Sequence, residues 1–157
     1  MTSSSPTSPD ASFEWRKLGL VFSPQAAEGR PWLREFAQAP ATLIGDDFVR
    51  VYFSCRPQAD EHGQYVSYSA FVDLDRSNLF RIRRLSDKPI LALGAEGTFD
   101  QFGTYPVSVI RDGDVVRAYY GGWTRCESVP FDVAIGAATS RDGGETFTKV
   151  GPGPILG

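Results

Sequence analysis

The chain has 157 residues, enough for one domain with a single hydrophobic core. Its 16 Lys and Arg residues against 19 Asp and Glu residues give a formal net charge of −3, which argues against a protein that binds nucleic acid mainly by neutralising phosphates. No apolar run approaches the roughly 20 residues that span a bilayer, and 41% hydrophobic residues are too many for a disordered chain. The 16 Gly and 11 Pro residues indicate short elements joined by many turns.

The N-terminal residues 1–12 have neither a basic start nor an apolar core, so they do not form a secretory signal. We expect a disordered tail there and a folded region over 13–157, in a cytoplasmic protein. Cys55 and Cys126 are too few for a disulfide framework and are expected to be free thiols. The single His62 lacks further His or Cys ligands at a suitable spacing, so the sequence predicts no metal site and no cofactor.

An internal repeat with an offset of about 66 residues runs through the chain. The offset is nearly constant along the whole unit, which is hard to obtain by chance, so the chain holds two copies of one module. The matching segments are Pro40–Asp46 with Pro106–Asp112, Val49–Phe53 with Val116–Tyr120, and Pro89–Leu91 with Pro154–Leu156.

Each copy has the pattern of four short antiparallel strands. Apolar Val49, Val51 and Phe53 alternate with Arg50 and Tyr52, as in a strand with two different faces. Asp-Gly pairs in two turns of the second copy are strong hairpin signals, because Gly accepts the positive φ that such turns require. The strands expected in the first copy are 40–44, 48–54, 65–73 and 80–85.

Four antiparallel strands at this spacing predict an all-β fold of β-propeller blades, with blade one at about 36–91 and blade two at about 100–157. Phe13–Lys17 is similar to the fourth strand of the second copy and is expected to act as a closing strand. Propellers usually have about four to eight blades, so we expect the chain to be the N-terminal part of a five-bladed ring, completed by further blades or by self-association. A β-sandwich is the alternative arrangement.

Blade topology places the starts of the first strands, the loops between second and third strands, and the link between blades on one common face. This face carries aromatic rings that can stack on sugars and polar groups that can bind hydroxyls or phosphate. Asp100 is the candidate catalytic carboxylate, and Trp32 and Asp132 lie on the same face. The candidate substrate-binding residues are Gln38, Arg56, Tyr105, Trp123, Arg125 and Glu127.

Arg56 and Arg125 each follow the second strand of their copy, so they are expected at equivalent positions in adjacent blades. Two guanidinium groups at one cavity suit an anionic group such as a carboxylate or phosphate. The alternative is that each Arg pairs with a carboxylate in its own loop. Trp123 either contributes to the same site or packs between the blades.

The segment Ser140–Phe147 has the form S-x-D-x-G-x-T-[WF], which resembles the Asp-box of sialidases and other propellers. Ser, Asp and Thr side chains in such a hairpin bind turn amides, while the aromatic residue packs inward. The hairpin lies on the face opposite the candidate site. We therefore expect it to serve folding and not catalysis.

Taken together, these features resemble the five-bladed propeller glycosidases: glycoside hydrolase family 43, the invertase and levansucrase families grouped with family 32, and mannoside phosphorylase family 130. The resemblance covers about 13–157 and is carried by the two first strands and by the segments Gly97–Gly103 and Ile135–Gly144. It implies a carbohydrate-active protein that hydrolyses or phosphorolyses a glycan or glycoconjugate. The alternative function is a non-catalytic carbohydrate-binding or scaffold propeller.

The chain departs from this resemblance at the acidic positions. The families carry an Asp general base just before the first-strand Pro, where this chain has Ala39. A second Asp is expected near the start of blade two, where Thr104 and Tyr105 stand and the nearest carboxylate is Asp100. Hydrolysis requires two carboxyl groups, whereas a phosphorylase uses one with phosphate held by Arg residues, and the residues here fit the second pattern slightly better.

Overall fold

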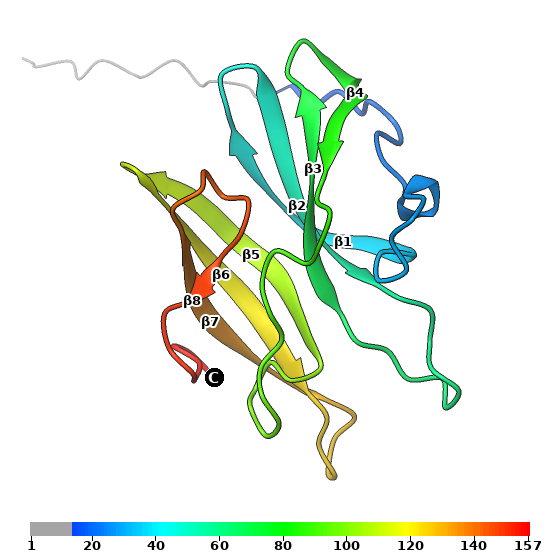
Figure 1. The fold of residues 1–157 in the computed structure, drawn as a ribbon, viewed down its shortest axis with the longest axis vertical. Helices are drawn as coiled ribbons and strands as arrows, with labels where there is room; N and C mark the ends of the chain where they lie inside the picture. The colour runs from blue at the N-terminus through cyan, green and yellow to red at the C-terminus, as the bar shows by residue number, and fades with distance from the viewer. Residues whose placement is uncertain (1–13) are drawn as a thin grey trace, which may run out of the picture.

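The computed structural model describes residues 14–157, so the tail expected over 1–12 and the first residue of the expected closing strand lie outside the described residues. Two antiparallel four-stranded sheets follow one another along the chain, in the orders β1-β2-β3-β4 and β5-β6-β7-β8 (Figure 1). The predicted all-β class with propeller-blade sheets is confirmed. The helical content of residues 14–157 is one 3-10 turn, η1 (Pro24–Ala26), and no helix there is long and apolar enough to cross a membrane.

We call the first sheet blade one and the second sheet blade two. Blade one consists of β1 (Glu35–Ile44), β2 (Phe48–Arg56), β3 (Tyr68–Asp75) and β4 (Asn78–Leu85). Blade two consists of β5 (Gly103–Asp112), β6 (Val115–Thr124), β7 (Asp132–Ser140) and the short β8 (Thr148–Lys149).

Several strand boundaries in blade one differ from the expectation, most of all the starts of β1 and β3. β1 begins five residues earlier, since Glu35 and Gln38 pair with the end of β2 across two register shifts. β3 begins at Tyr68 and not at residue 65, because the backbone just before it pairs with blade two instead. The amide of Ser67 donates to the Phe102 carbonyl at 3.0 Å, and the Ser67 carbonyl accepts from Thr104 at 3.0 Å.

The expected closing strand is not formed in the described part of the chain. Residues 14–17 have no strand geometry, and Trp15 is 94% exposed. A closing strand pairs with the last blade of a ring, and in the described part of the chain residues 14–17 join neither of the two sheets. The role in ring closure therefore stays a prediction.

The two blades enclose a shared core. Strand alternation points Tyr52 of β2 toward blade two, and Val116 of β6 points back, so both are fully buried. The segment linking the blades adds backbone bonds: the Ile90 amide donates to the Ser69 carbonyl at 3.0 Å, and the Ile90 carbonyl accepts from Phe147 at 2.8 Å. The buried members of this core are Ala41, Leu43, Tyr52, Phe71, Ile90 and Val116.

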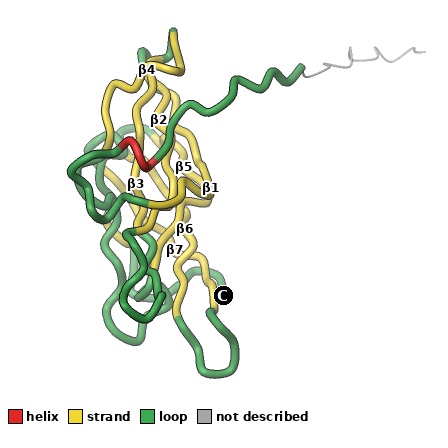
Figure 2. The backbone as a smooth tube through the Cα atoms, turned by 90° about the vertical axis from the view of Figure 1, so that its right-hand side faces the viewer, coloured by secondary structure: helices red, strands yellow, loops and turns green. Residues whose placement is uncertain are grey.

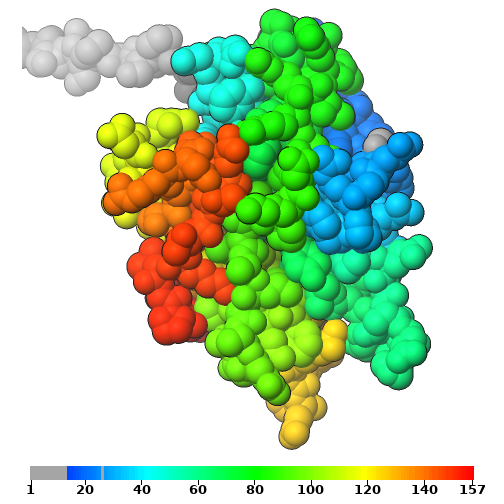
Figure 3. Space-filling view, viewed as in Figure 1, coloured from blue at the N-terminus to red at the C-terminus, as the bar shows by residue number. Residues whose placement is uncertain are grey.

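The opposite face of blade one is covered by the chain that precedes β1. Leu33 and Ala27 are buried against Phe53 and Cys55, and burial raises the pKa of the Cys55 thiol to about 12. Figure 2 shows η1 in red beside the strands, and Figure 3 shows the blue N-terminal segment lying against the green residues of blade one. Blade one is therefore covered on both faces.

Serine, aspartate and threonine side chains hold the hairpin between β7 and β8 together. The Asp142 carboxylate accepts from the Ser140 hydroxyl at 2.6 Å, from the Thr146 hydroxyl at 2.6 Å and from the Glu145 amide at 2.9 Å. The Gly144 amide donates to the Ser140 hydroxyl oxygen at 2.9 Å. Partial burial opposes the charged form of Asp142, but these bonds outweigh it and hold the pKa of Asp142 well below its ordinary value.

This hairpin also docks on blade one. The Arg50 guanidinium donates to the Gly143 carbonyl at 3.2 Å, and the Tyr52 hydroxyl donates to the Gly144 carbonyl at 2.8 Å. Arg50 is 2% exposed and forms a two-point ion pair with Asp73, at 2.7 and 2.8 Å. The hairpin of one blade is thus fixed by a buried cation and a buried phenol of the preceding blade.

Candidate functional site

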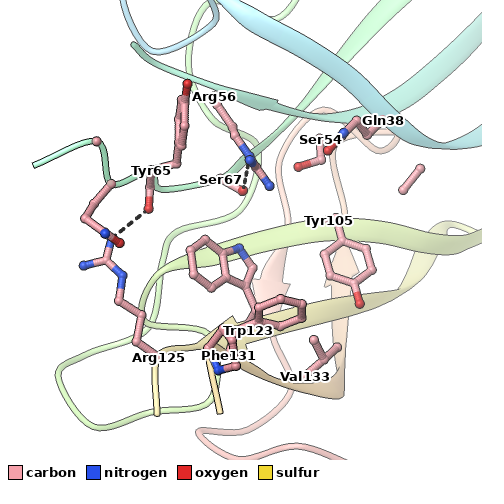
Figure 4. A pocket seen from close by; sticks show the side chains of 14 residues that line it. Gln38, Ser54, Arg56, Tyr65, Ser67, Tyr105, Trp123, Arg125, Phe131 and Val133 are labelled. Atoms are coloured by element: carbon pink, nitrogen blue, oxygen red, sulfur yellow. Dashed lines mark hydrogen bonds between the residues drawn. The ribbon is translucent and has the colours of Figure 1, made fainter. Parts of the chain in front are cut away.

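A cavity of about 520 Å³ opens between the two blades, on the face predicted from the blade topology (Figure 4). We call it the interblade cavity. Its walls are the start of β1, the ends of β2 and β6, the start of β5, and the loops that follow β2 and β6. Its volume lies in the range of small-molecule sites, roughly 300–1,000 Å³. Of the residues predicted for substrate binding, Gln38, Arg56, Tyr105, Trp123 and Arg125 line it.

The wall formed by β1 has an unusual backbone. Register shifts separate Glu35, Gln38 and Ala41 along their pairing with β2. Between them Phe36 and Ala39 adopt φ values of 62° and 50°, in the left-handed region that non-glycine residues rarely occupy. Such strain costs of order 1 kcal/mol or more per residue and occurs preferentially at functional sites. Ala39 lines the cavity, so this strained backbone belongs to the site.

Two aromatic rings lie across blade two where glycines leave room for them. Trp123 pairs with Gly103 and Tyr105 pairs with Gly121 in the β5–β6 register. A Cβ atom at Gly103 would collide with the indole of Trp123, and one at Gly121 would collide with the ring of Tyr105. Each ring therefore packs directly against the bare backbone of a glycine. Burial raises the pKa of Tyr105, so its hydroxyl stays protonated and available as a donor.

Arg56 is fixed at the end of β2 by neutral groups. Its Nε donates to the Ser67 hydroxyl at 3.2 Å, and its guanidinium lies over the rings of Phe36 and Tyr65, 5.1 and 5.2 Å from their centroids. The Glu35 carboxylate beside the Tyr65 hydroxyl raises the pKa of Tyr65. Arg56 thus has two aromatic neighbours and one hydroxyl acceptor.

Arg125 is fixed in the same manner on blade two. Its Nη2 donates to the Tyr65 carbonyl at 3.0 Å, and its guanidinium lies 4.1 Å from the centroid of Phe102. Phe102 also packs against Trp123, with centroids 6.0 Å apart. In residues 14–157, the ion pairs within 4.0 Å involve other cations, so neither Arg56 nor Arg125 has the local carboxylate that the alternative interpretation expected.

Asp100 lies outside the interblade cavity. It is 1% exposed, and its carboxylate pairs with Lys149 Nζ at 2.6 Å. It also accepts from the Tyr120 hydroxyl at 3.0 Å and the Thr98 hydroxyl at 3.1 Å. These contacts tie the link between the blades to β6 and β8. They hold the carboxylate in the protein interior away from the cavity, and the catalytic role of Asp100 stays a prediction.

Other predicted members of the face also lie elsewhere. Glu127 is exposed in the β6–β7 loop and does not line the cavity. Asp132 begins β7 and accepts from the Val133 amide at 2.9 Å. Trp32 packs edge-on against Tyr68, at a centroid distance of 6.3 Å, on the far side of blade one. Within residues 14–157, the cavity wall contains no Asp or Glu.

The prediction missed several lining residues, above all Tyr65, Ser67 and Phe131. The sequence predicts a regular strand from residue 65, yet Tyr65 and Ser67 lie in a loop that reaches toward blade two. The available signal was the apolar run Val129-Pro130-Phe131, which follows the polar start of the β6–β7 loop. Phe131 is 59% exposed, which places an apolar ring at the rim of the cavity.

No family model matches the chain. Two uncharacterized proteins of Mycobacterium tuberculosis, MT1551 and Rv1502, are similar to it, each with 35% identity over 143 residues. The match covers 90% of this chain but 45% of each relative, so the chain spans about half the length of the curated relatives it matches.

Two solved structures share the fold. Zg3597, a family 117 glycoside hydrolase from the marine bacterium Zobellia galactanivorans, matches with a TM-score of 0.65 and 16% identity, over 84% of this chain and 36% of that one. A structure from the GH130 family of mannoside phosphorylases, which contains hydrolases that target β-1,2-mannosidic linkages in Candida mannan, matches with a TM-score of 0.64 and 19% identity. It covers 93% of this chain and 43% of that one. At these identities the likeness shows that the chain shares the fold of the corresponding part of each structure, and nothing about its activity.

Proposed function

We propose that the interblade cavity binds a carbohydrate, and that Arg56 and Arg125 select one with a carboxylate or phosphate group. The observation that carries this proposal is the pair of guanidinium groups held at one cavity by aromatic faces and neutral acceptors. A cation that has no carboxylate partner keeps its charge available for an incoming anion. The propeller fold shared with carbohydrate-active proteins supports the same interpretation.

Trp123 and Tyr105 supply the stacking surface in this proposal. Both rings pack on glycine backbone, which restricts their rotamers and lowers the conformational freedom lost when a ligand packs on them. Their apolar faces suit the C–H face of a sugar ring, while Gln38 and the Tyr105 hydroxyl suit its hydroxyl groups.

Glycosidic bond cleavage by a propeller enzyme requires carboxyl groups at the bond. The wall formed by residues 14–157 supplies cations and rings but no carboxylate, and this favours the non-catalytic binding alternative for these two blades. In a hydrolase or phosphorylase built on this chain, the acid and any base come from other parts of the active protein. The catalytic role expected of Asp100 is left out of the proposal, because its carboxylate is buried against Lys149.

Calorimetric titration with three probes tests the proposal: trigalacturonate, β-1,2-mannobiose and inorganic phosphate. We expect the acidic sugar to bind more tightly than the neutral one, and its affinity to fall with added salt. Arg56→Ala and Arg125→Ala should each lower the affinity for the acidic sugar roughly tenfold or more, since a hydrogen bond to a charged group is lost. Trp123→Ala should lower the affinity for both sugars.

Two exposed residues away from the cavity provide matched controls. Arg141→Ala removes a cation on the opposite face, and Trp15→Ala removes an indole that is 94% exposed. Both variants should bind as the unaltered chain does. Binding of no probe, or binding that the cavity variants leave unchanged, would contradict the proposal.

A further inference from the structure

Equivalent faces of the two blades differ in burial. The face of blade one that carries Arg50 and Tyr52 holds blade two. The repeat aligns these residues with Arg117 and Tyr119 of blade two, within Val49–Phe53 and Val116–Tyr120. The second pair lies on a face that nothing covers among the described residues: Tyr52 is fully buried, whereas Tyr119 is 41% exposed.

The residues that pair with the two arginines across the first hairpin of each blade differ in the same direction as the tyrosines. Leu43 pairs with Arg50 and is 6% exposed, while Ile110 pairs with Arg117 and is 49% exposed. The residues that follow the fourth strand of each blade show the same contrast: Ile90 is 6% exposed, whereas its repeat equivalent, Ile155, is 57% exposed.

The hydrogen-bonding groups recur along with the apolar ones. The Ile90 amide donates to the Ser69 carbonyl at 3.0 Å, and the Ile155 amide donates to the Ile135 carbonyl at 2.7 Å. The Ile90 carbonyl then accepts from Phe147 of the following blade. The carbonyl of Ile155 is the equivalent acceptor on blade two.

We infer that this face, formed by Ile110, Arg117, Tyr119 and Ile155, is the docking site of a third module of the same repeat. The module would present the two carbonyls of an Asp-Gly-Gly hairpin to Arg117 and Tyr119, as Gly143 and Gly144 do to blade one. It would also place an amide on the Ile155 carbonyl. This inference is independent of the carbohydrate proposal.

A second copy of this chain is a poorer occupant. The face of its blade two that could dock is already packed against its own blade one, with Val116 fully buried. The remaining face of its blade one is covered by Ala27 and Leu33. The outer hairpin of blade one has the sequence Asp75-Arg-Ser-Asn78 and lacks the Gly-Gly pair.

The inference can be tested by supplying the module. A copy of residues 93–157 appended after Gly157 continues the repeat in register, because Leu156 aligns with Leu91. Ile110→Cys in the first copy, with Cys126→Ser in both copies, reports exposure of the face through its rate of thiol alkylation. The remaining thiol, Cys55, is buried and unreactive.

We expect alkylation of Ile110→Cys to be roughly tenfold or more slower in the extended chain than in the unextended one. Arg117→Ala in the first copy should remove most of that protection. Glu61→Cys, on an exposed loop of blade one, should react equally in both chains.

Two results would overturn the inference. In one, Ile110→Cys reacts as fast in the extended chain as in the unextended one, whether the appended module is folded or unfolded. In the other, the unextended chain already protects Ile110→Cys in a concentration-dependent manner, which would assign the face to a second copy.

Discussion

Blade one and blade two have matching sequences but different surroundings. Blade one has both faces covered, and Arg50 on β2 is buried against Asp73. Blade two has one face covered, and the equivalent Arg117 pairs with Asp112 at 2.6 Å in an exposed position. The same strand pattern thus gives a buried anchor in one blade and a surface ion pair in the other. The neighbour decides the energetic role of the residue.

The largest expected contrast comes from matched substitutions of the two arginines. Arg50→Ala leaves the Asp73 carboxylate buried without its cation and should lower the free energy of unfolding by about 3–5 kcal/mol. Arg117→Ala removes an exposed pair and should cost less than about 1 kcal/mol. Urea unfolding of the two variants measures the difference. Equal losses would contradict the distinction between the blades.

Asp100 tests whether blade two has a buried anchor of its own. Asp100→Asn breaks the pair with Lys149 in a site that is 1% exposed and should cost about 2–4 kcal/mol. Asp114→Asn, in the exposed β5–β6 hairpin, should have almost no effect. Thermal unfolding compares them. If Asp100→Asn left the stability unchanged and abolished ligand binding, Asp100 would instead belong to the site.

The hairpin of blade two should show its stabilisation through pH. The folded pKa of Asp142 lies below its unfolded value near 3.9, so its bonds stabilise fully above that pH and are lost as pH falls through the lowered value. Asp142→Asn should cost about 1 kcal/mol at neutral pH, allowing for solvent screening. The difference in free energy of unfolding between Asp142→Asn and the unaltered chain should become smaller below about pH 4.

Asp75 in the outer hairpin of blade one is the matched control. The Ser77 hydroxyl lowers its pKa, but this hairpin is exposed and docks on no other blade. Asp75→Asn should therefore perturb unfolding less than Asp142→Asn. If the stability difference between Asp142→Asn and the unaltered chain stayed constant down to about pH 2, the lowered pKa of Asp142 would not stabilise the fold.

The smallest expected effect concerns the strained start of β1. Ala39→Gly should stabilise the chain by up to about 1 kcal/mol, because glycine adopts the φ of 50° without steric cost. Ala37→Gly, two residues away without a positive φ, should destabilise it by about 0.5–1 kcal/mol. Denaturant midpoints distinguish the two variants. A loss of stability in Ala39→Gly would show that the backbone at Ala39 is not strained.

Much of the fold could be predicted because its signals are local. Alternation along Val49–Phe53 and the Asp-Gly turns identify strands and hairpins. Blade topology then places Arg56 and Arg125 on one face, and the structure brings both to the same cavity.

The rest depends on contacts between distant residues. Asp100 is a candidate for the site from its residue type alone, whereas its burial depends on Lys149, 49 residues further along the chain. The early start of β1 depends on register shifts against β2, which no local pattern encodes. The covering of blade one by Ala27 and Leu33 depends on an irregular segment with no strand signal.

The most direct test of the account is amide chemical-shift mapping of the chain during titration with trigalacturonate. We expect the hairpin at Asp142 on the opposite face to stay unperturbed and the perturbations to cluster around Arg56, Ser67, Tyr105, Trp123 and Arg125. Perturbations centred on that hairpin or on Asp100, with no shift changes around the interblade cavity, would contradict binding of the sugar in that cavity.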